Sequence, residues 1–300
     1  MSLIHPQLAA FAAVIEEASF DGAAQRLSVT PSAISQRVKA LEDRLGQVLI
    51  VRQLPCRPTE AGEKLLRKVK PMLALEAEAY EDFQLEQPNA VNRRLAIAVN
   101  DDSLETWVLP ALATLNQEFG YLFDVIVDDQ DHSLSLLRNG SAVGAVTSET
   151  KAIQGCDIHA LGTMRYHAIA SHEFKQRFFA EGLNLESLTK APMLVFSRKD
   201  ELQNRFIQQV VGHDLYPPTH YIPTSTGFVE AAALHLGWCM VPECMIQQAL
   251  ADGKVVLIHP SVTIDVPLYW QHASIRSTTL QNLTKVFVNQ AQAKLAFVEP

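Results

Sequence analysis

The side chains best suited to polar chemistry lie between positions 30 and 40, where hydroxyl, amide and ammonium groups recur at helical spacing. They are Ser32, Ser35, Gln36 and Lys39. At about 100° per residue they share one face of a helix, and an apolar stripe follows the opposite face. The stripe consists of Ile34, Val38, Leu41 and Leu45, which are predicted to pack inward. Outward-facing donors and acceptors of this kind are suited to contact base edges and phosphates in a groove of DNA.

The flanking residues predict that this helix is the second of a helix-turn-helix. Thr30 is a favoured N-cap residue and Pro31 suits the first helical position, so a helix should begin there. Upstream, another short segment has a small apolar face formed by Phe20, Ala23, Ala24 and Leu27. An isolated amphipathic surface helix shows the same two faces, but two such segments joined by a Leu-Ser-Val turn favour a helix-turn-helix.

A polar, proline-containing hairpin follows, bracketed by residues 49–52 and by Pro58 and Thr59. It is predicted to form a wing that carries two arginines, so that residues 1–58 make a winged helix-turn-helix domain. In such a domain the polar face of the second helix approaches base edges or nearby phosphates. The DNA backbone is expected to be anchored mainly by Thr30, Arg37, Arg52 and Arg57.

The motifs of this segment resemble those of the LysR-type transcriptional regulators. They are Ala23-Ala24-x-x-Leu27, the run from Thr30 to Glu42, and Thr59-Glu60-Ala61-Gly62. Residues 35–39 and 51–59 are similar to the branch of that family called ArgP or LysG, which responds to lysine and arginine. Looser similarity continues through residues 99–104, 143–146 and 268–270, so the resemblance covers most of the chain.

The resemblance implies a domain order and a set of partners. A linker and dimerisation helix is expected over residues 59–90, and a two-lobed effector domain, like a periplasmic binding protein, over residues 91–300. Lobe I would comprise residues 91–161 and 266–300, and lobe II residues 162–265. The implied partners are double-stranded DNA, a small effector, a second copy of the chain and RNA polymerase. Dimers of the family commonly pair into tetramers, and their two-fold symmetry matches a split, roughly palindromic DNA site.

A long helix is predicted directly after the wing, with Thr59 as its N-cap. Its acidic side lies between Glu76 and Glu86, and its apolar side consists of Leu65, Val69, Met72, Ala79 and Phe83. The spacing resembles a coiled-coil seam between two chains, while an ordinary docked helix is the alternative. Pro71 removes a hydrogen bond inside this helix, so either a kink or a stabilising partner helix is expected there.

Composition limits the class of protein. The chain has 300 residues, of which 48% are hydrophobic, and this suits two or three globular domains. The sequence contains no signal peptide and no membrane-spanning run, which predicts a cytoplasmic protein without a membrane partner. The four cysteines lack C-x-x-C spacing, which argues against a zinc site or a disulfide scaffold, and no cofactor is expected.

Charge is distributed unevenly along the chain. The formal net charge is −8, yet residues 1–70 hold ten Lys and Arg against seven Asp and Glu. The rest of the chain holds 15 basic against 26 acidic residues. A modestly basic head is consistent with phosphate contacts, and an acidic remainder is consistent with a cationic ligand.

Beyond Arg94, apolar runs rich in Val and Ile alternate with helical patterns, which predicts an α/β fold. The first three strands are expected at residues 95–99, 123–127 and 143–147, with helices near residues 103–119 and 132–139 between them. Further strands are expected at residues 166–170, 193–196, 219–222, 238–241, 255–258 and 266–271. These are too many for one compact sheet, so two lobes are predicted.

Polar residues at the carboxyl ends of the predicted strands form a candidate ligand site. Ligands of open α/β sheets bind beyond these ends, where helix N-termini also point. The residues of lobe I are Asn100, Asp101, Asp102, Ser103, Asp128, Asp129, Thr147 and Glu149, and those of lobe II are Thr224, Ser225 and Thr226. Asp128 or Asp129 is expected to hold a cationic side chain, while N–H groups near Ser103 and residues 224–226 hold a carboxylate. This layout suits lysine or arginine, although Ser and Asp are also common caps and paired acids are often only solvated.

Other classes of function have less support. The sequence lacks G-x-S-x-G, P-loop, H-E-x-x-H and dinucleotide-binding patterns, so no enzymatic activity is expected. Two alternatives to a regulator of lysine or arginine response remain: a LysR-type regulator with a different effector, and a solute-binding protein with the same two lobes. Retention on DNA at low salt would distinguish a regulator from a pure solute binder.

Overall fold

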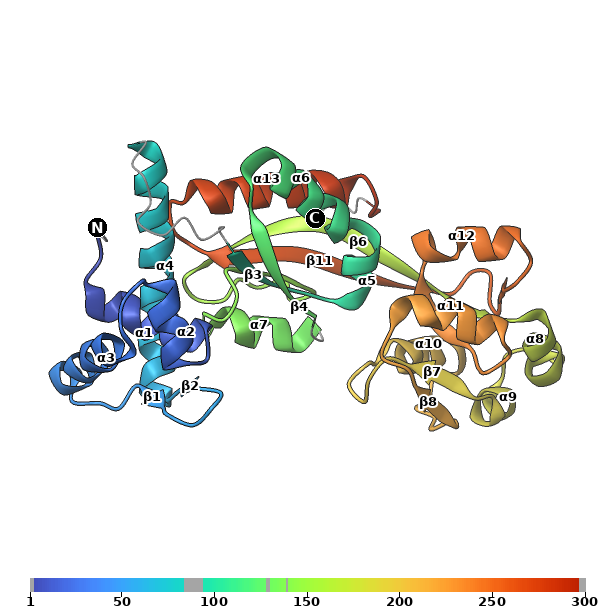
Figure 1. The fold of residues 1–300 in the computed structure, drawn as a ribbon. Helices are drawn as coiled ribbons and strands as arrows, with labels where there is room; N and C mark the ends of the chain where they lie inside the picture. Colours follow the sequence, from blue (N-terminus) through green and yellow to red (C-terminus); the bar gives the residue numbers. More distant parts are fainter. Residues whose placement is uncertain (1–2, 84–93, 128–129, 139, 297–300) are drawn as a thin grey trace.

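The computed structural model describes residues 3–83, 94–127, 130–138 and 140–296. The chain forms a small helical head, one long helix and a two-lobed α/β body (Figure 1). The fold predicted from the sequence, a helix-turn-helix head followed by a long helix and an α/β body, is therefore confirmed.

The head consists of three helices and a two-stranded hairpin. These are α1 (Pro6–Glu16), α2 (Phe20–Arg26), α3 (Pro31–Leu45), β1 (Ile50–Val51) and β2 (Arg57–Pro58). The predicted inward stripe of α3 is confirmed for Ile34, Val38 and Leu41, which are buried in the core of the head. The prediction is wrong for Leu45, which is 46% exposed, because α3 ends there and Gly46, at a φ of 64°, turns the chain away from the core.

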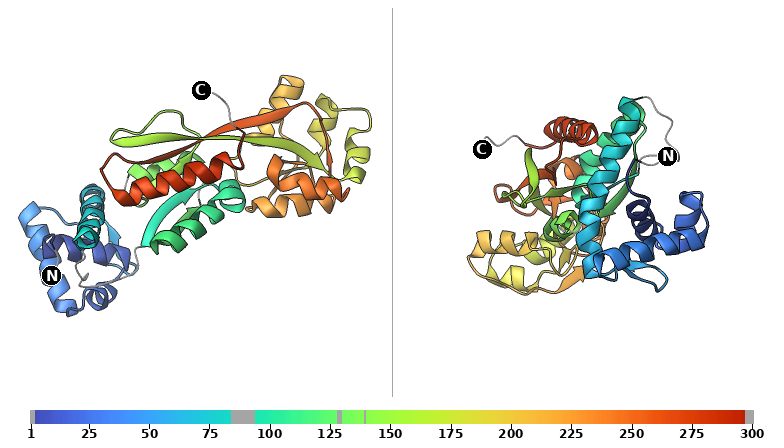
Figure 2. Two further views of the ribbon diagram at one scale, coloured as in Figure 1. Left: turned by 90° about the horizontal axis from the view of Figure 1, so that it is seen from above. Right: turned by 90° about the vertical axis from the view of Figure 1, so that its left-hand side faces the viewer.

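The long helix α4 (Glu60–Asp82) joins the head to the body, and both views of Figure 2 place it between them. Thr59 caps it by accepting a hydrogen bond from the N–H of Gly62 at 3.1 Å. Val69 packs into the core of the head. At Gly140 of lobe I an added Cβ atom would lie 3.1 Å from the Cα atom of Arg67, so the helix backbone also lies close against the body. The helix continues through Pro71.

One acid of α4 departs from the predicted pattern. Met72, and Phe83 directly after the helix, belong to the predicted apolar side and are 43% and 74% exposed in the single chain, so they are not docked on the head or the body. Glu78, which was predicted on the acidic outer side, is buried at 8% exposure. The reason is that α4 packs on the head and on lobe I of its own chain, so more than one of its faces is covered. Glu86 lies outside the described residues.

One sheet extends through both lobes. In the described part of the chain it has seven strands, in the order β10-β6-β11-β5-β3-β4, with β9 also paired to β6. Its strands are β3 (Arg94–Val99), β4 (Leu122–Val127), β5 (Gly144–Thr147), β6 (Cys156–Ala170), β9 (Cys239–Pro242), β10 (Val256–Leu257) and β11 (Thr263–Ala273). The first three are parallel, and β6 and β11 form a long antiparallel pair that continues from one lobe into the other (Figure 1).

Helices cover the sheet of lobe I on both faces. They are α5 (Asp101–Ser103), a π-helical turn at Leu104–Val108, α6 (Leu109–Phe119), α7 (Gln130–Arg138) and α13 (Thr278–Gln292). In Figure 1 α6 and α13 lie on one side of the sheet and α7 on the other. Trp107, Trp270 and Phe287 are buried between α13 and the sheet. The first helix of the lobe begins at Asp101, two residues before the predicted start.

Lobe II holds the remaining elements. They are α8 (His172–Phe179), α9 (Leu185–Lys190), β7 (Met193–Val195), α10 (Leu202–Val211), β8 (Thr219–Tyr221), α11 (Ser225–Ala233) and α12 (Glu243–Ala251). The strands β7 and β8 pair in parallel as a separate small sheet. The helix α11 begins at Ser225, three residues before the predicted start near Phe228, because the Thr224 hydroxyl accepts a hydrogen bond from the N–H of Gly227 at 3.4 Å.

Candidate functional site

The polar face of α3 is exposed on the head. The hydroxyl of Thr30 accepts a hydrogen bond from the N–H of Ala33 at 3.2 Å, so this residue caps the helix. Ser32, Gln36 and Lys39 are exposed, while Ser35 is half-buried. A row of unobstructed donors on a rigid helix can reach the base edges of a DNA major groove.

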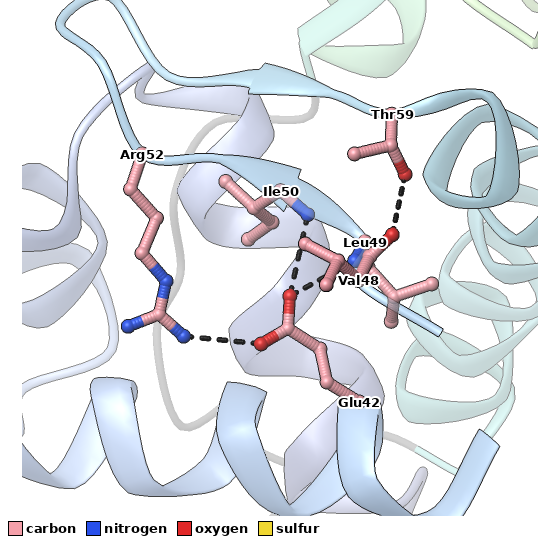
Figure 3. Close-up of polar contacts among 6 residues, drawn as sticks. All are labelled: Glu42, Val48, Leu49, Ile50, Arg52 and Thr59. Atoms are coloured by element: carbon pink, nitrogen blue, oxygen red, sulfur yellow. Dashed lines mark hydrogen bonds and ion pairs between the residues drawn. The ribbon is translucent and has the colours of Figure 1, made fainter. Parts of the chain in front are cut away.

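Glu42, beside the polar face of α3 at the flank next to Ser35, holds the wing in place (Figure 3). One carboxylate oxygen accepts hydrogen bonds from the N–H groups of Leu49 at 2.9 Å and Ile50 at 3.4 Å. The other oxygen pairs with the guanidinium of Arg52 at 3.0 Å. Because one side chain bonds the backbone and a side chain of the hairpin, the orientation of the wing is coupled to that of α3.

Thr59 and Gly62 attach the wing to α4. The Thr59 hydroxyl donates a hydrogen bond to the carbonyl of Val48 at 2.6 Å (Figure 3). At Gly62 an added Cβ atom would lie 2.1 Å from the carbonyl oxygen of Leu49, so only glycine fits at this position. The Thr-x-x-Gly motif therefore has a structural explanation in close backbone packing.

The three arginines predicted to anchor DNA have different surroundings. Arg52 pairs with Glu42 and also lies over the ring of Phe20, 5.4 Å from its centroid. Its side chain remains 50% exposed, so one part of the guanidinium is available to a phosphate. Arg57 is exposed and Arg37 half-buried, and neither forms an ion pair with a residue that the structure describes.

The second candidate site lies where the two lobes meet. The N–H of Ser225, in the first turn of α11, donates a hydrogen bond of 2.7 Å to the carboxylate of Asp101 from lobe I. Asn100 and Ser103 flank this contact in sequence; both are buried, and the Asn100 Oδ1 and Ser103 Oγ atoms have no hydrogen-bond partner among the described residues. Buried polar atoms without partners are uncommon and often belong to ligand sites.

Asp102 and Tyr166 form a second polar contact beside the first. The Tyr166 hydroxyl donates a hydrogen bond of 2.6 Å to Asp102 Oδ2. Burial raises the pKa of Asp102 to about 6, although hydrogen bonds from Ser225 and Tyr166 act in the opposite direction. The negative charges of Asp200 and Asp101 add to the increase. A cluster of acids whose charge is poorly compensated favours a positively charged ligand.

The structure brings together only part of the predicted ligand site. Asp101, Asp102 and Ser225 meet as described, and the cap residue Thr224 and the exposed Thr226 lie at the same helix start, with their hydroxyl oxygens 3.2 Å apart. Two other predicted residues, Thr147 and Glu149, contact each other. The buried Thr147 hydroxyl accepts a hydrogen bond from the N–H of Glu149 at 3.1 Å. The Glu149 side chain is exposed. The predicted cation ligands Asp128 and Asp129 lie outside the described residues.

Two residues of this site were not found from the sequence. Asp200 of lobe II lies near enough to Asp102 to raise its pKa, and its carboxylate accepts hydrogen bonds from the N–H groups of Phe196 and Leu202. It follows the predicted strand at residues 193–196, so the rule applied to the strand ends of lobe I would also have found it. Nothing in the sequence distinguished the Tyr166 hydroxyl from other residues of a buried strand.

Comparison with known proteins identifies the family. Residues 5–63 match the model of the bacterial regulatory helix-turn-helix proteins of the lysR family, and residues 88–292 match the LysR substrate binding domain. The regulator LysG of Mycobacterium tuberculosis is 45% identical over 279 residues, which cover 93% of this chain and 90% of that protein. The chain belongs to the LysR family of transcriptional regulators. The ArgP regulator of Pseudomonas aeruginosa is also similar, with 39% identity over 95% of this chain and 94% of that protein.

Solved structures of LysR regulators agree with this assignment. ArgP from Mycobacterium tuberculosis matches with a TM-score of 0.85 and 43% identity over 99% of this chain and all of that one. Full-length LysG from Corynebacterium glutamicum, with arginine bound as effector, matches with a TM-score of 0.75 and 37% identity over 98% of this chain and all of that one. The resemblance to the ArgP/LysG branch that the sequence motifs indicated is confirmed.

Membership in the LysR family settles the general class of function. The chain is a DNA-binding transcriptional regulator with a helix-turn-helix and a ligand-binding domain, and its family is one of regulators, not of enzymes. Within the described ranges, no helix combines the length and the apolar character needed to cross a membrane.

Proposed function

We propose that this LysR-family regulator senses a basic amino acid, lysine or arginine, bound between lobes I and II. The observation that carries the proposal is the contact between the Asp101 carboxylate and the Ser225 N–H at the start of α11, next to Asp102. The N–H groups of a helix start bind carboxylates, and the Asp101 contact is an example within the chain itself. The surrounding acids suit the ammonium or guanidinium groups of the same ligand.

The proposal includes a way for the effector to act. An effector carboxylate competes with Asp101 for the N–H groups at the start of α11, so binding exchanges a contact between the lobes for a contact with the ligand. An effector that prefers one arrangement of the lobes shifts the population toward that arrangement. The arginine bound to LysG of Corynebacterium glutamicum supports this choice of ligand class.

Calorimetry on the full chain tests the choice of effector. L-lysine or L-arginine is expected to bind at least about tenfold more tightly than L-leucine, because the half-buried acids of this site pair with a positive charge that leucine lacks. D200N, which removes a carboxylate beside Asp102, is expected to weaken this binding, while D157N, which removes a carboxylate at the far end of lobe I, should leave it unchanged. Equal affinity for all three amino acids, or no binding, would exclude a basic amino acid as effector.

On DNA, we assign contacts with base edges or nearby phosphates to Ser32, Ser35, Gln36 and Lys39, and backbone contacts mainly to Thr30, Arg37, Arg52 and Arg57. The exposure of the α3 polar face supports the first group. The pairing of Arg52 with Glu42 gives this arginine a second, wing-holding role. RNA polymerase is the further partner that we propose for the complex on DNA.

We also propose that two chains associate through α4 and that the domain boundaries are residues 58/59 and 90/91. Three exposed apolar side chains, two on α4 and one directly after its end, support a second copy as the partner, since apolar side chains gathered on one element can form an interface. They are Met72, Leu75 and Phe83, exposed by 43%, 41% and 74%. Analytical ultracentrifugation of M72K/L75K should show weaker self-association than the unchanged chain, and an unchanged mass would contradict this interface.

A further inference from the structure

A recess at the outer end of lobe I is separate from the contact between the lobes. It has a volume of about 600 Å³ and lies between the start of β6, the end of β11 and the first turns of α13. His159, in this recess, and Tyr166, in the interlobe site, are seven positions apart on the same strand, which corresponds to about 23 Å. The recess and the interlobe site are therefore distinct.

Two histidines form one wall of the recess. The rings of His159 and His272 stack with centroids 5.3 Å apart and an interplanar angle of 15°. His272 Nδ1 lies 2.9 Å from the carbonyl oxygen of Ala273, which can only accept, so Nδ1 carries the hydrogen and Nε2 is left for another partner. Burial and the neighbouring His272 lower the pKa of His159, and Asp157 opposes them.

Two cationic side chains also line the recess. Arg276 and Lys285 both line the recess and are exposed, and neither forms an ion pair within the described part of the chain. The acid among the lining residues, Asp157, accepts a hydrogen bond from the Ser274 hydroxyl at 2.8 Å. Thr284 Oγ1 accepts from the indole N–H of Trp270 at 3.1 Å, so its own hydroxyl hydrogen can be donated elsewhere.

We propose that this recess is a second ligand site, which binds a small anion with more than one negative charge, such as a phosphate or a polycarboxylate. Two fixed cations and two imidazoles surround a space of the size of a small molecule, in a part of the chain that is otherwise strongly acidic. An anion between them accepts charge-assisted hydrogen bonds from Arg276 and Lys285. It also stabilises the protonated form of His159, which burial and the neighbouring His272 disfavour.

The position of the recess gives such a ligand a route to the rest of the molecule. Arg276 immediately precedes Ser277, whose hydroxyl bonds to Glu78 of α4 at the start of α13. An anion held by Arg276 therefore acts beside the contact that joins the body to the long helix. The effects of the interlobe effector and of this anion would therefore be transmitted to the head through different elements.

Nuclear magnetic resonance on the full chain tests the proposal, with sodium phosphate and sodium citrate as separate probes and sodium chloride at matched ionic strength as the reference. Either probe is expected to raise the pKa of His159 and to shift the ring resonances of His272 relative to chloride, and the comparison of the two shows which anion the site prefers. If neither probe raises the pKa of His159 relative to chloride, the proposal is wrong.

Variants separate a built site from general charge screening. R276Q and K285Q are each expected to weaken binding of the preferred probe about tenfold, since each removes a charged hydrogen-bond donor. K254Q, which removes a lysine from lobe II, should have no effect, and equal weakening by all three would overturn the proposal. D101N, which alters the interlobe site, should leave anion binding unchanged. The test of the recess is therefore independent of the interlobe effector.

Discussion

Glu78 on the long helix α4 accepts a hydrogen bond from the hydroxyl of Ser277, although 199 positions separate the two residues in the chain. The same carboxylate accepts from the N–H groups of Thr278 at 3.2 Å and Thr279 at 3.0 Å. An acid is favoured at this position because the N–H groups and the dipole of α13 point toward it. This buried contact attaches the helix that leaves the head to lobe I of the body.

Replacing Glu78 with glutamine should loosen this attachment. The neutral amide accepts more weakly from three donors, so E78Q is expected to lower the free energy of unfolding by about 1–3 kcal/mol. Hydrogen exchange should become faster in the first turn of α13. E63Q, at an exposed acid on the same helix, is the control and should change neither measurement.

The Glu78 contact should also depend on pH. Burial raises the pKa of this carboxyl, but hydrogen bonds from Ser277, Thr279 and Thr278 outweigh it and hold the pKa below the ordinary value of 4.5. A lowered pKa in the folded state contributes stability above pH 4.5, and this contribution is lost as the pH falls through the folded value. Denaturation at pH 3 to 6 should therefore show a smaller loss of stability in E78Q than in the unchanged chain. Equal losses would argue against ionised Glu78 as the acceptor.

Replacing Asp102 with asparagine should separate stability from ligand binding. Because the folded pKa of about 6 lies above the ordinary value of 3.8, the ionised carboxylate destabilises the ligand-free fold at neutral pH. D102N is expected to raise the free energy of unfolding at pH 7 by on the order of 1–3 kcal/mol and to abolish lysine or arginine binding. If D102N instead has a lower free energy of unfolding than the unchanged chain at pH 7, neighbouring groups stabilise the Asp102 charge in the folded protein, and the prediction is wrong.

In the unchanged chain, affinity for a basic amino acid should fall as the pH is lowered through 6. A cationic ligand binds the ionised form of Asp102, and protonation below the pKa of about 6 competes with it. Calorimetry with arginine from pH 5 to 8 checks this, since the arginine side chain keeps its charge throughout the range. An affinity that does not change with pH would remove Asp102 from the site.

Glu42 should control DNA affinity through the wing without touching DNA. E42Q weakens the acceptor of the Leu49 and Ile50 N–H groups and removes the charge that pairs with Arg52. Fluorescence anisotropy with an operator fragment should show about tenfold weaker binding and a helix content unchanged by circular dichroism. D43N, at the exposed neighbour, is the matched control and should bind as the unchanged chain does.

Gln36 and Lys39 should affect DNA binding in different ways. Q36A is expected to lose about 1–3 kcal/mol of discrimination at one base pair, because an amide reads a base edge. K39A is expected to weaken binding to all sequences and to reduce the slope of log affinity against log salt by about 1, because a lysine beside the base edges reaches a phosphate. K68A, on an exposed part of α4, should change neither property. If Q36A/K39A binds the operator as the unchanged chain does, α3 is not the recognition helix.

The sequence predicts those features of the structure that depend on neighbouring residues in the chain. The cap at Thr30, the start of α3 at Pro31 and the buried positions Ile34 and Val38 were all predicted, because capping and helical periodicity are local properties. The family motifs also predicted the domain order and the class of function, which periodicity alone does not indicate. Leu45 was misjudged, since its position in the stripe is correct but the core does not extend to the end of α3.

By itself, the sequence determined the order of the elements, the polar face of α3 and the acids that follow the strands, since each depends on residue type and short spacing. Only the tertiary structure decided which polar groups meet. Asp101 reaches Ser225 across 124 positions, and Glu78, expected on a solvated face, became the buried acceptor at the start of α13. The physical reason is that the packing of distant elements determines which donor a carboxylate contacts, and the local sequence pattern does not encode that packing.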